Sequence, residues 1–365
     1  MPTVLARPKA NGVSLLGDDA QSIRKWQDYV AHNPNATIYH DIAWREIFGR
    51  ALGYRSYYLV AEAGDGAVTG ILPLFRVPSL FGRPRLVSVP FRDRGGVVAD
   101  DTESFRALVD AATTMLGRLG GAGLELKTLV PYPEDALRDT GLRRVDHWLH
   151  SRVDLAEIAN RTLQKALRDK MRAVRQGIEA GLRFDDMTDR PDAVARWHRV
   201  YSASQHSLGV PAFSQRFFEA MIASLAPRGL LRLYVVTNAA GKNVAATIVL
   251  NDRHVSIYAY SASDPVERST RPNDFMLYNL YGALIEAGQL AFDFGADSPD
   301  QEGLLRFKRK WQASQQLIPF YYLGKGDPAD TDSSSHRFDL ARSIVRAMPI
   351  AASRALLAPL VRYFG

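Results

Sequence analysis

Cysteine is absent from the 365-residue sequence. Its absence excludes disulfide scaffolds, cysteine-ligated zinc and thiol nucleophiles, and it leaves the redox compartment open. Long apolar runs are also lacking, because no stretch approaches the roughly 20 residues that a membrane-spanning helix needs. Residues 1–17 do not contain the continuous apolar segment of a secretion signal, so we expect a cytoplasmic protein.

Acidic residues are outnumbered, with 39 Asp and Glu against 46 Lys and Arg and a formal net charge of +7. A basic balance favours acidic partners such as phosphates, nucleic acid or an anionic membrane surface, and a merely basic surface is the alternative. The 46% hydrophobic content is ordinary for a globular protein, and 365 residues suit two domains.

An internal repeat relates the two halves of the chain. Residues 58–74 (YLVAEAGDGAVTGILPL) align without a gap with residues 234–250 (YVVTNAAGKNVAATIVL), so that Tyr58 matches Tyr234. Each copy reads as a strand, a glycine-containing turn and a second strand, which predicts a β-hairpin. A repeat of this length indicates a duplicated domain rather than a solenoid.

The same order of elements follows each hairpin: a strand, a polar loop, a helix and another strand. We expect them at 85–90, 102–119 and 124–129 in the first half, and at 255–261, 275–287 and 290–295 in the second. This order is similar to that of GNAT (acetyltransferase-like) domains. The predicted fold is therefore α/β (α+β), with tandem GNAT-like domains at 1–149 and 150–323, a linker at 324–336 and a helical tail at 337–365.

Five sequence blocks stand in a fixed order along residues 35–323. They are Tyr57–Val60 with Gly70–Leu74; Ser88–Phe91 with Gly95-Gly96; Lys170–Arg172 with Arg175 and Gly181-Leu182; Leu208–Pro211; and Phe292–Gly295 followed by Phe307–Trp311. Together they resemble the Fem family, although Gln312 stands where many relatives carry Gly. The resemblance implies transfer of an acyl or aminoacyl group to a cell-envelope precursor, in a branch associated with exopolysaccharide synthesis.

Residues 157–180 are predicted to form one basic helix. Basic side chains recur there at intervals of four, three, four and three residues: Arg161, Lys165, Arg168, Arg172 and Arg175. On a helix they would share one stripe, beside an inward-facing apolar stripe that ends at Ile178. Such a stripe suits a diphosphate, a nucleotide-sugar or a tRNA backbone, and a solvated helix face is the alternative.

The glycine-rich loop that holds the pyrophosphate of coenzyme A in GNAT enzymes has no match here. The second half offers Arg268, Arg271 and Asn273 at that place, as phosphate contacts and a helix cap, and the first half offers Arg92 and Arg94. Two acyl donors therefore stay open, acyl-CoA and aminoacyl-tRNA.

The resemblance also assigns candidate catalytic residues. Lys308 corresponds to the lysine that Fem-like enzymes use to stabilise the negative charge that develops on the carbonyl oxygen. Asp293, at a strand end, would accept the proton of the attacking amine or orient the acceptor, and a structural carboxylate is the alternative. Trp311, which closes the same block, is a predicted substrate contact. We expect no metal, since His147 and His150 lack ligand partners at metal spacing.

The tail at 337–365 carries five Arg against one Asp, with apolar residues at helical spacing. It fits a helix lying on a membrane surface, and docking on the protein itself is the alternative. The leading hypothesis is a Fem-type acyltransferase acting on a phosphate-bearing glycan precursor, free or lipid-linked, at the inner face of the membrane. The alternatives are an acyl-CoA-dependent acetyltransferase that modifies polysaccharide and a non-catalytic binding protein with degenerate GNAT domains.

Overall fold

The computed structural model describes residues 10–80, 82–324 and 339–365. Its strands are β1 (Ala10–Leu15), β2 (Arg55–Ala63), β3 (Val68–Val77), β4 (Arg85–Val87), β5 (Val98–Ala99), β6 (Gly123–Lys127), β7 (Arg143–Asp154), β8 (Arg183–Asp186), β9 (Leu231–Thr237), β10 (Asn243–Asp252), β11 (Val255–Ser263), β12 (Ala291–Asp297) and β13 (Ser314–Gly324).

The α-helices are α1 (Ala20–His32), α2 (Ala43–Leu52), α3 (Thr102–Arg118), α4 (Glu134–Leu137), α5 (Leu155–Asn160), α6 (Leu163–Ala166), α7 (Met171–Glu179), α8 (Ala193–Leu208), α9 (Gln215–Leu225), α10 (Pro272–Glu286), α11 (Glu302–Lys310), α12 (Asp339–Ala347) and α13 (Ile350–Leu357). Short 3-10 turns are η1 (Ile38–His40), η2 (Arg168–Lys170), η3 (Ala226–Arg228), η4 (Pro265–Thr270) and η7 (Ala358–Tyr363).

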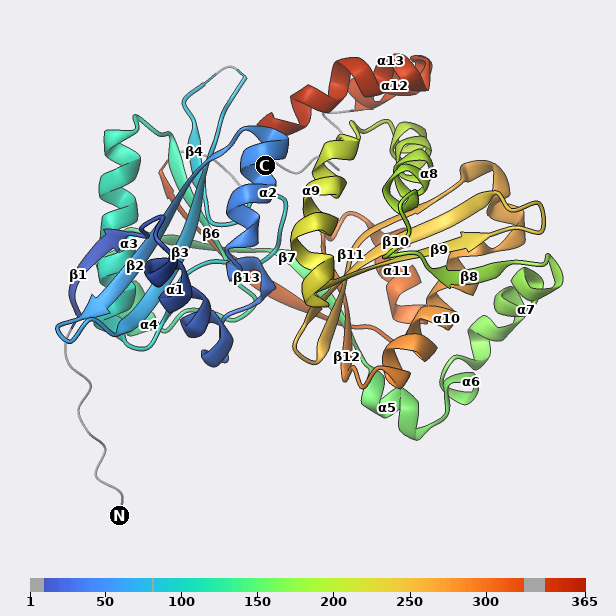
Figure 1. Cartoon of the computed structure of the whole chain (residues 1–365), viewed down its shortest axis with the longest axis horizontal. Helices are drawn as coiled ribbons and strands as arrows, with labels where there is room; N and C mark the ends of the chain where they lie inside the picture. Colours follow the sequence, from blue (N-terminus) through green and yellow to red (C-terminus); the bar gives the residue numbers. More distant parts are fainter. Residues whose placement is uncertain (1–9, 81, 325–338) are drawn as a thin grey trace.

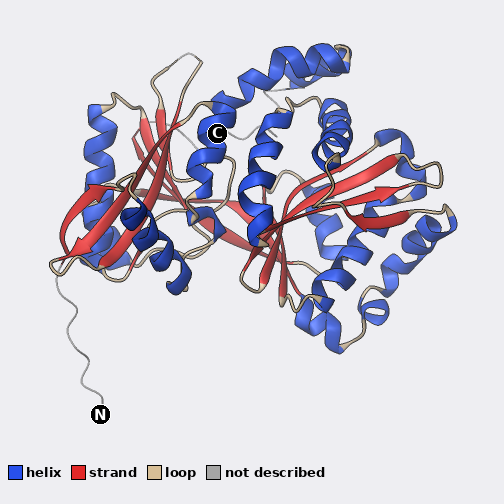
Figure 2. Cartoon of the chain, viewed as in Figure 1, coloured by secondary structure: helices blue, strands red, loops and turns tan. Residues whose placement is uncertain are grey.

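All strands of the described residues belong to one sheet that runs through the whole molecule (Figures 1 and 2). The strand order is β1-β2-β3-β4-β6-β13-β7-β12-β11-β10-β9-β8, with β5 beside β3. We call β1–β6 with α1–α4 the first lobe and β8–β12 with α5–α11 the second lobe. The predicted α/β fold with a duplicated unit is confirmed, because β2-β3-β4-β6 and β9-β10-β11-β12 are the same arrangement read from opposite edges.

The two predicted hairpins form as expected. β2 pairs with β3, and β9 pairs with β10, both antiparallel. Gly66 (φ 79°) and Gly241 (φ 76°) supply the left-handed residue that each tight turn requires. In both lobes the next strand joins antiparallel and then pairs in parallel with the strand after the helix, which is the GNAT order.

The lobes exchange strands at the centre of the sheet. β13, from the end of the second half, pairs with β6, while β7, from the end of the first half, pairs with β12. β7 and β13 then pair with each other and close the gap between the lobes. The expected boundary between residues 149 and 150 falls inside β7, so the sheet cannot be cut there without separating paired strands.

The core lies between the lobes as well as within them. Side chains of α1, α2, α8 and α9 form one apolar cluster, in which the rings of Phe48 and Phe217 are 6.1 Å apart. α3 covers the other face of the first lobe, and α10 covers the other face of the second. Arg228 adds a polar link by donating to both carboxylate oxygens of Asp41, at 2.8 and 2.6 Å. The shared core fixes one lobe against the other.

The predicted continuous basic helix at 157–180 is wrong. The segment is divided into α5, α6, η2 and α7, and Thr162 between the first two has a left-handed backbone (φ 61°). The regular spacing therefore does not give one stripe. Val174 is buried as expected, but Ile178, predicted to face inward, is exposed.

The tail packs on the protein over part of its length. α12 and α13 lie against α8 (Figure 1), and Tyr54 donates a 2.6 Å hydrogen bond to the carbonyl of Arg362. Val345 and Val361 are buried, whereas Leu340 and Ile344 are exposed. The expected linker at 325–336 and the first two residues of the tail lie outside the described residues. No described helix combines the length and apolarity needed to cross a membrane.

Candidate active site

The two parallel strands of the second lobe separate and open a cavity. β11 pairs with β12 only over Val255–Ile257 and Ala291–Asp293, after which β12 continues beside β7. A cavity of about 370 Å³ lies beyond the point of separation, and we call it the central cavity. Residues 257–259 and 294–296 form one side, and residues of the first lobe form the other.

The first lobe supplies most of the charged groups of the central cavity. Arg85 and Lys127 both pair with Glu125, at 2.8 and 3.0 Å. Glu125 and Lys127 are two residues apart on β6, so their side chains share one face of the strand. Arg92 and Tyr39 also line the cavity. The site therefore combines residues from both halves of the sequence.

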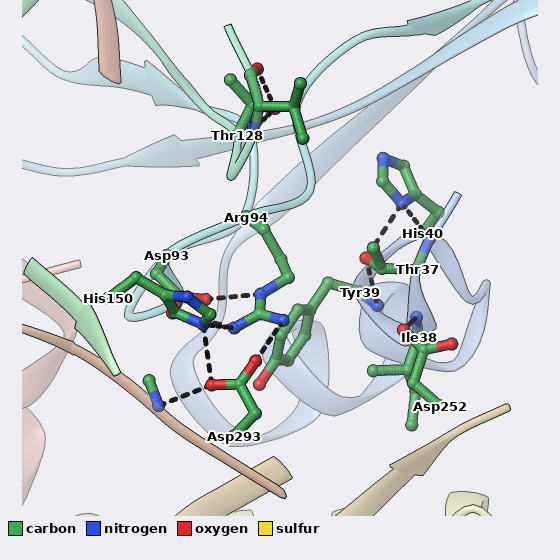
Figure 3. A network of polar contacts seen from close by, with 12 residues as sticks. Thr37, Ile38, Tyr39, His40, Asp93, Arg94, Thr128, His150, Asp252 and Asp293 are labelled. Carbon is green, nitrogen blue, oxygen red and sulfur yellow. Dashed lines mark hydrogen bonds and ion pairs between the residues drawn. The ribbon is translucent and has the colours of Figure 1, made fainter. Parts of the chain in front are cut away.

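A buried ionic network lies next to this cavity (Figure 3). The Arg94 guanidinium contacts Asp293 at 2.7 Å and Asp93 at 2.8 Å. His150 Nε2 lies 2.8 Å from Asp293, and the backbone N–H of Gly295 donates to the same carboxylate at 2.7 Å. Arg94 and Asp93 come from the loop after β4, His150 from β7 and Asp293 from β12, so the network joins both lobes.

The network determines the protonation of Asp293. Burial by itself raises the pKa of this carboxyl, but the Arg94 guanidinium and the hydrogen bond from His150 together hold the pKa well below its usual range. Because the ionised carboxylate only accepts, a hydrogen bond from His150 to Asp293 requires the proton on Nε2, the nitrogen that also lies 3.2 Å from Arg94 Nη2. Asp293 is consequently a weak base, which favours the expected orienting role over proton abstraction.

One buried cluster bears on the expectation that no metal is bound. Ligand atoms of Asp93, His150 and Asp293 lie within 4.8 Å of one another, as in a metal site. Arg94, however, already places its positive charge between the two carboxylates. Burial opposes that charge, yet the two carboxylates raise the pKa of Arg94 well above its ordinary value. A metal ion would have to displace this guanidinium.

Lys308 is buried behind the wall of the central cavity rather than in it. Its ammonium group donates to the carbonyl of Phe294 at 2.9 Å and pairs with Asp297. Burial raises the pKa of Asp297, and the attraction of Lys308 opposes that shift. Lys308 thus fixes residues 294–297, three of which line the cavity, and its predicted contact with a reacting carbonyl would require rearrangement.

Trp311 lies in the core and does not line the central cavity. It is fully buried, its ring meets Tyr281 at 5.5 Å, and Lys170 stands 5.0 Å from the ring centroid. Trp311 therefore packs α11 against the rest of the second lobe, and it is not in position to contact a molecule in the central cavity.

Exposed arginines gather where α7 meets the start of α10, and none of them lines the central cavity. Lys170 pairs with Asp274 at 2.7 Å, and Gln176 donates to the carbonyl of Ser269 at 2.8 Å, so α7 runs beside the start of α10. The exposed arginine side chains are those of Arg168 in η2, Arg172 and Arg175 in α7, Arg268 in η4 and Arg271 before α10.

Asn273 does not cap α10. Arg271 occupies the cap position, with a left-handed backbone (φ 56°), and Pro272 begins the helix. The side chain of Asn273 donates to Ser263 instead, at 3.1 Å.

A second cavity of about 560 Å³ lies on the other side of the loop after β4. Arg94, Gly95 and Gly96 line it, together with the start of α3, and Lys127 lines both cavities. The loop and Lys127 are therefore a shared wall.

Several residues of the site were not found by sequence reasoning. Tyr39, Glu125 and Lys127 line the central cavity, and Asp297 pairs with Lys308. A signal was present for two of them, because Glu125 and Lys127 are charges on one face of an otherwise apolar strand. Tyr39 and Asp297 carry no comparable local signal.

Comparison with known proteins gives the context for this geometry. Residues 161–309 match the family model described as Acetyltransferase (GNAT) domain. A search of curated proteins found no match.

Among solved structures, FemX is 15% identical with a TM-score of 0.66, over 88% of this chain and 98% of that chain. The C-terminal domain of a proposed lysylphosphatidylglycerol synthetase from Agrobacterium fabrum is 16% identical with a TM-score of 0.56, over 90% and 95%. A tandem GNAT protein from the clavulanic acid biosynthesis pathway is 15% identical with a TM-score of 0.55, over 86% and 99%.

At these identities the likeness to solved structures establishes the fold, while the family match concerns the second half of the chain. The chain therefore has the tandem GNAT fold seen in FemX, and residues 161–309 of its second half match an acetyltransferase (GNAT) domain.

Proposed function

We propose that the protein transfers an acyl or aminoacyl group to a phosphate-bearing envelope or exopolysaccharide precursor, and that the transfer takes place in the central cavity. The observation that carries the proposal is the position of this cavity, where β11 and β12 separate and where both lobes contribute side chains. Its volume is in the range of small-molecule sites.

The donor approaches from the second lobe. The N-terminus of α10 carries a partial positive charge, and exposed arginines of α7 and of the loop before α10 surround it. A polyanionic donor, either coenzyme A or the acceptor end of a tRNA, suits this surface. The related structures named above include one linked to lysylphosphatidylglycerol synthesis and a GNAT protein, so both donors remain candidates.

Acyl transfer requires a nucleophile, a polarised carbonyl and a leaving group. Asp293 stays ionised through its contact with Arg94, so the role we assign it is to orient Arg94 and the loop after β4. Lys308 acts through the cavity wall, by holding the backbone of residues 294–297. Displacement of coenzyme A or tRNA releases a group that can take the proton of the attacking amine or hydroxyl.

Contact with the inner face of the membrane belongs to the same proposal. Leu340 and Ile344, one turn apart, form an exposed apolar edge on α12, and Leu356 is exposed on α13. Arg354 of α13 is exposed as well. An apolar edge with arginines nearby suits an anionic lipid surface, which would bring a lipid-linked acceptor near the cavity.

The experiment that tests the function is a transfer assay with two labelled donors. Purified protein is incubated with labelled acetyl-CoA or labelled aminoacyl-tRNA and a nucleotide-linked amino sugar, and label in the sugar is measured. We expect label from one of the donors, and at least a tenfold lower rate for Arg94→Lys, which cannot bridge two carboxylates as a guanidinium does. Absence of transfer from either donor, with the donor bound, would support the non-catalytic alternative.

A further inference from the structure

Arg92 is a buried cation without a carboxylate partner. Its side chain is 9% exposed, and among the described residues no Asp or Glu forms an ion pair with it. Its Nη2 donates to the hydroxyl of Tyr260, and its Nε–H finds no hydrogen-bond partner in the described part of the chain. Burying a charge without a counterion costs free energy, so an anion bound beside Arg92 would stabilise it.

The neighbouring Arg94 shows what Arg92 lacks. The two arginines flank Asp93 on one loop, and the Asp93 carboxylate turns to Arg94, which also receives Asp293. Arg94 therefore forms ion pairs with two carboxylates, whereas Arg92 forms none with any residue that the structure describes. Arg92 lines the central cavity beside Asp93, and it keeps only a longer-range attraction to that carboxylate.

Aromatic rings hold Arg92 in place. Its guanidinium carbon lies 4.5 Å from the ring centroid of Tyr260, 5.4 Å from that of Trp44 and 5.6 Å from that of Tyr39. Cation–π contacts of this kind stabilise the charge but do not satisfy its N–H donors. The rings therefore orient the guanidinium and leave hydrogen-bonding capacity for another group.

The backbone before Arg92 is strained in a way that fixes this orientation. Phe91 has φ 63°, a left-handed conformation that is uncommon for a residue with a bulky side chain. Strained residues of this kind persist where the surrounding structure demands them, and they cluster at binding sites. The ring of Phe91 packs 4.9 Å from that of Phe213, which anchors the loop to the second lobe.

Tyr39 provides a second unused donor at the same place. It is 2% exposed and lines the central cavity, and its hydroxyl forms no hydrogen bond within the described part of the chain. The turn that carries it is held by Trp44 and Trp26, whose indole N–H groups donate at 2.8 Å to the carbonyls of Ile38 and His40. The other cations of the cavity, Arg85 and Lys127, already share Glu125.

We propose that Arg92 and Tyr39 form a receptor for an oxyanion, a phosphate or a carboxylate, carried by the acceptor that enters the central cavity. The inference rests on the proposed function in assigning the cavity to the acceptor. The guanidinium supplies charge and the phenol a neutral donor, a combination that suits a tetrahedral or planar oxyanion. The receptor would hold the acceptor by its anionic group and leave its nucleophile free to meet the donor from the second lobe.

The test is a titration of the full chain with inorganic phosphate and, separately, with acetate at constant ionic strength. The signal is the NMR resonance of the arginine Nε–H groups in protein labelled with ¹⁵N-arginine, with the Arg92 resonance assigned by its loss in Arg92→Lys. We expect a saturable shift of that resonance, and the anion that binds more tightly identifies the class of acceptor group.

Tyr39→Phe should weaken phosphate binding about fivefold, the value of one neutral hydrogen bond, because the ring contacts with Arg92 remain. The matched control is Tyr281→Phe, which removes the hydroxyl of a buried tyrosine that does not line the central cavity and that donates to the carbonyl of Trp311 at 3.1 Å. This control should leave phosphate affinity unchanged.

A flat titration of the Arg92 resonance with both anions would overturn the receptor, and so would equal affinities for wild type and Tyr39→Phe. The experiment needs no donor and no turnover. A negative result therefore removes the receptor alone, and the transfer reaction is still judged by its own assay.

Discussion

The two lobes place equivalent helices after equivalent strands, but the starts of those helices differ in charge. α3 begins at the capping residue Asp101, whose carboxylate accepts from Ser104 N–H at 2.7 Å, with Asp100 before it and Glu103 in its first turn. α10 begins after the exposed Arg271, with the exposed Arg268 in the preceding turn, while the acidic residues there, Asp274 and Glu267, are paired with Lys170 and Lys242. The positive end of α3 is satisfied by its own acidic residues, whereas exposed arginines stand at that of α10.

Under the proposed function, this difference gives the two lobes different roles. An anionic donor would be repelled at the start of α3 and attracted at the start of α10, although the strand order is the same in both lobes. The first lobe instead supplies side chains that line the central cavity, and the buried Asp93–Arg94–Asp293 network ties the lobes together.

Cutting the network between the lobes should have the largest effect. Asp293→Ala leaves Arg94 with one carboxylate and removes the acceptor of His150 and Gly295. Loss of one partner of a buried ion pair costs about 3–5 kcal/mol of unfolding free energy. Urea denaturation measures it, and Glu62→Gln, in a surface pair with Lys25, is the control at about 1 kcal/mol or less. Equal losses in the two variants would show that the network does not tie the lobes.

The same network predicts an acid dependence. The pKa of Asp293 is lowered in the folded protein, so its contribution to stability is fully present above the unfolded pKa of about 4 and is lost as pH falls below it. The stability difference between wild type and Asp293→Asn should therefore shrink as pH falls below about 4. Denaturation midpoints between pH 3 and 7 measure this, and a constant difference would contradict the assigned pKa direction.

The buried pair of Lys308 and Asp297 should show whether Lys308 acts through structure or through chemistry. Lys308→Met leaves Asp297 buried without its cation and should cost about 3 kcal/mol of stability as well as the transfer activity. Lys308→Met/Asp297→Leu should regain most of the stability. If the double variant also regains transfer, Lys308 only supports the cavity wall; if it stays inactive, the ammonium group is needed for the reaction.

Charge reversal at the two helix starts tests the comparison itself. Arg268→Glu/Arg271→Glu should weaken binding of coenzyme A or tRNA about tenfold at low salt, with a smaller salt dependence of the remaining affinity. The matched change in the first lobe, Glu103→Arg, should leave that affinity within about twofold, since its helix start still carries Asp101. Equal losses of donor affinity from the changes in both lobes would contradict the proposal that the donor binds at the start of α10.

The exposed edge of α12 should give the smallest effect. Leu340→Ser/Ile344→Ser removes two exposed apolar side chains without touching the buried Val345. Sedimentation with anionic liposomes should fall severalfold, since loss of the equivalent of one buried methylene group costs about 0.8 kcal/mol. Arg50→Ser, on the exposed surface of α2, is the control. Unchanged sedimentation would leave the tail with only its docking role on α8.

The duplicated fold could be read from the sequence because its signals are local. The two hairpins are defined by alternating apolar residues around Gly66 and Gly241, and the strands that follow are short apolar runs between polar loops. The exchange of β7 and β13 could not be predicted from the sequence. Strands some 170 residues apart carry no local sequence feature that shows that they pair. The division of residues 157–180 was missed for a related reason, since helical spacing survives in a segment that Thr162 interrupts.

Only part of the candidate site could be predicted from the sequence. Asp293, Arg92 and Arg94 were predicted, and the structure brings them to one network or to the cavity beside it. Their neighbours His150 and Tyr39 were not foreseen, because residues so far apart in the sequence meet only once the sheet has formed. Lys308 and Trp311 were also singled out, but a buried lysine–aspartate pair and a core tryptophan have the same sequence signature as a substrate contact.

The most direct test of the account is hydrogen–deuterium exchange of the full chain, free and with saturating coenzyme A or tRNA. We expect one of these donors to slow exchange at residues 264–275, at the start of α10, and at residues 294–296, in the wall of the central cavity. We also expect residues 98–106, at the start of α3, to exchange at the same rate with and without donor. Protection at 98–106 instead of 264–275 would contradict the central claim that the second lobe receives the donor.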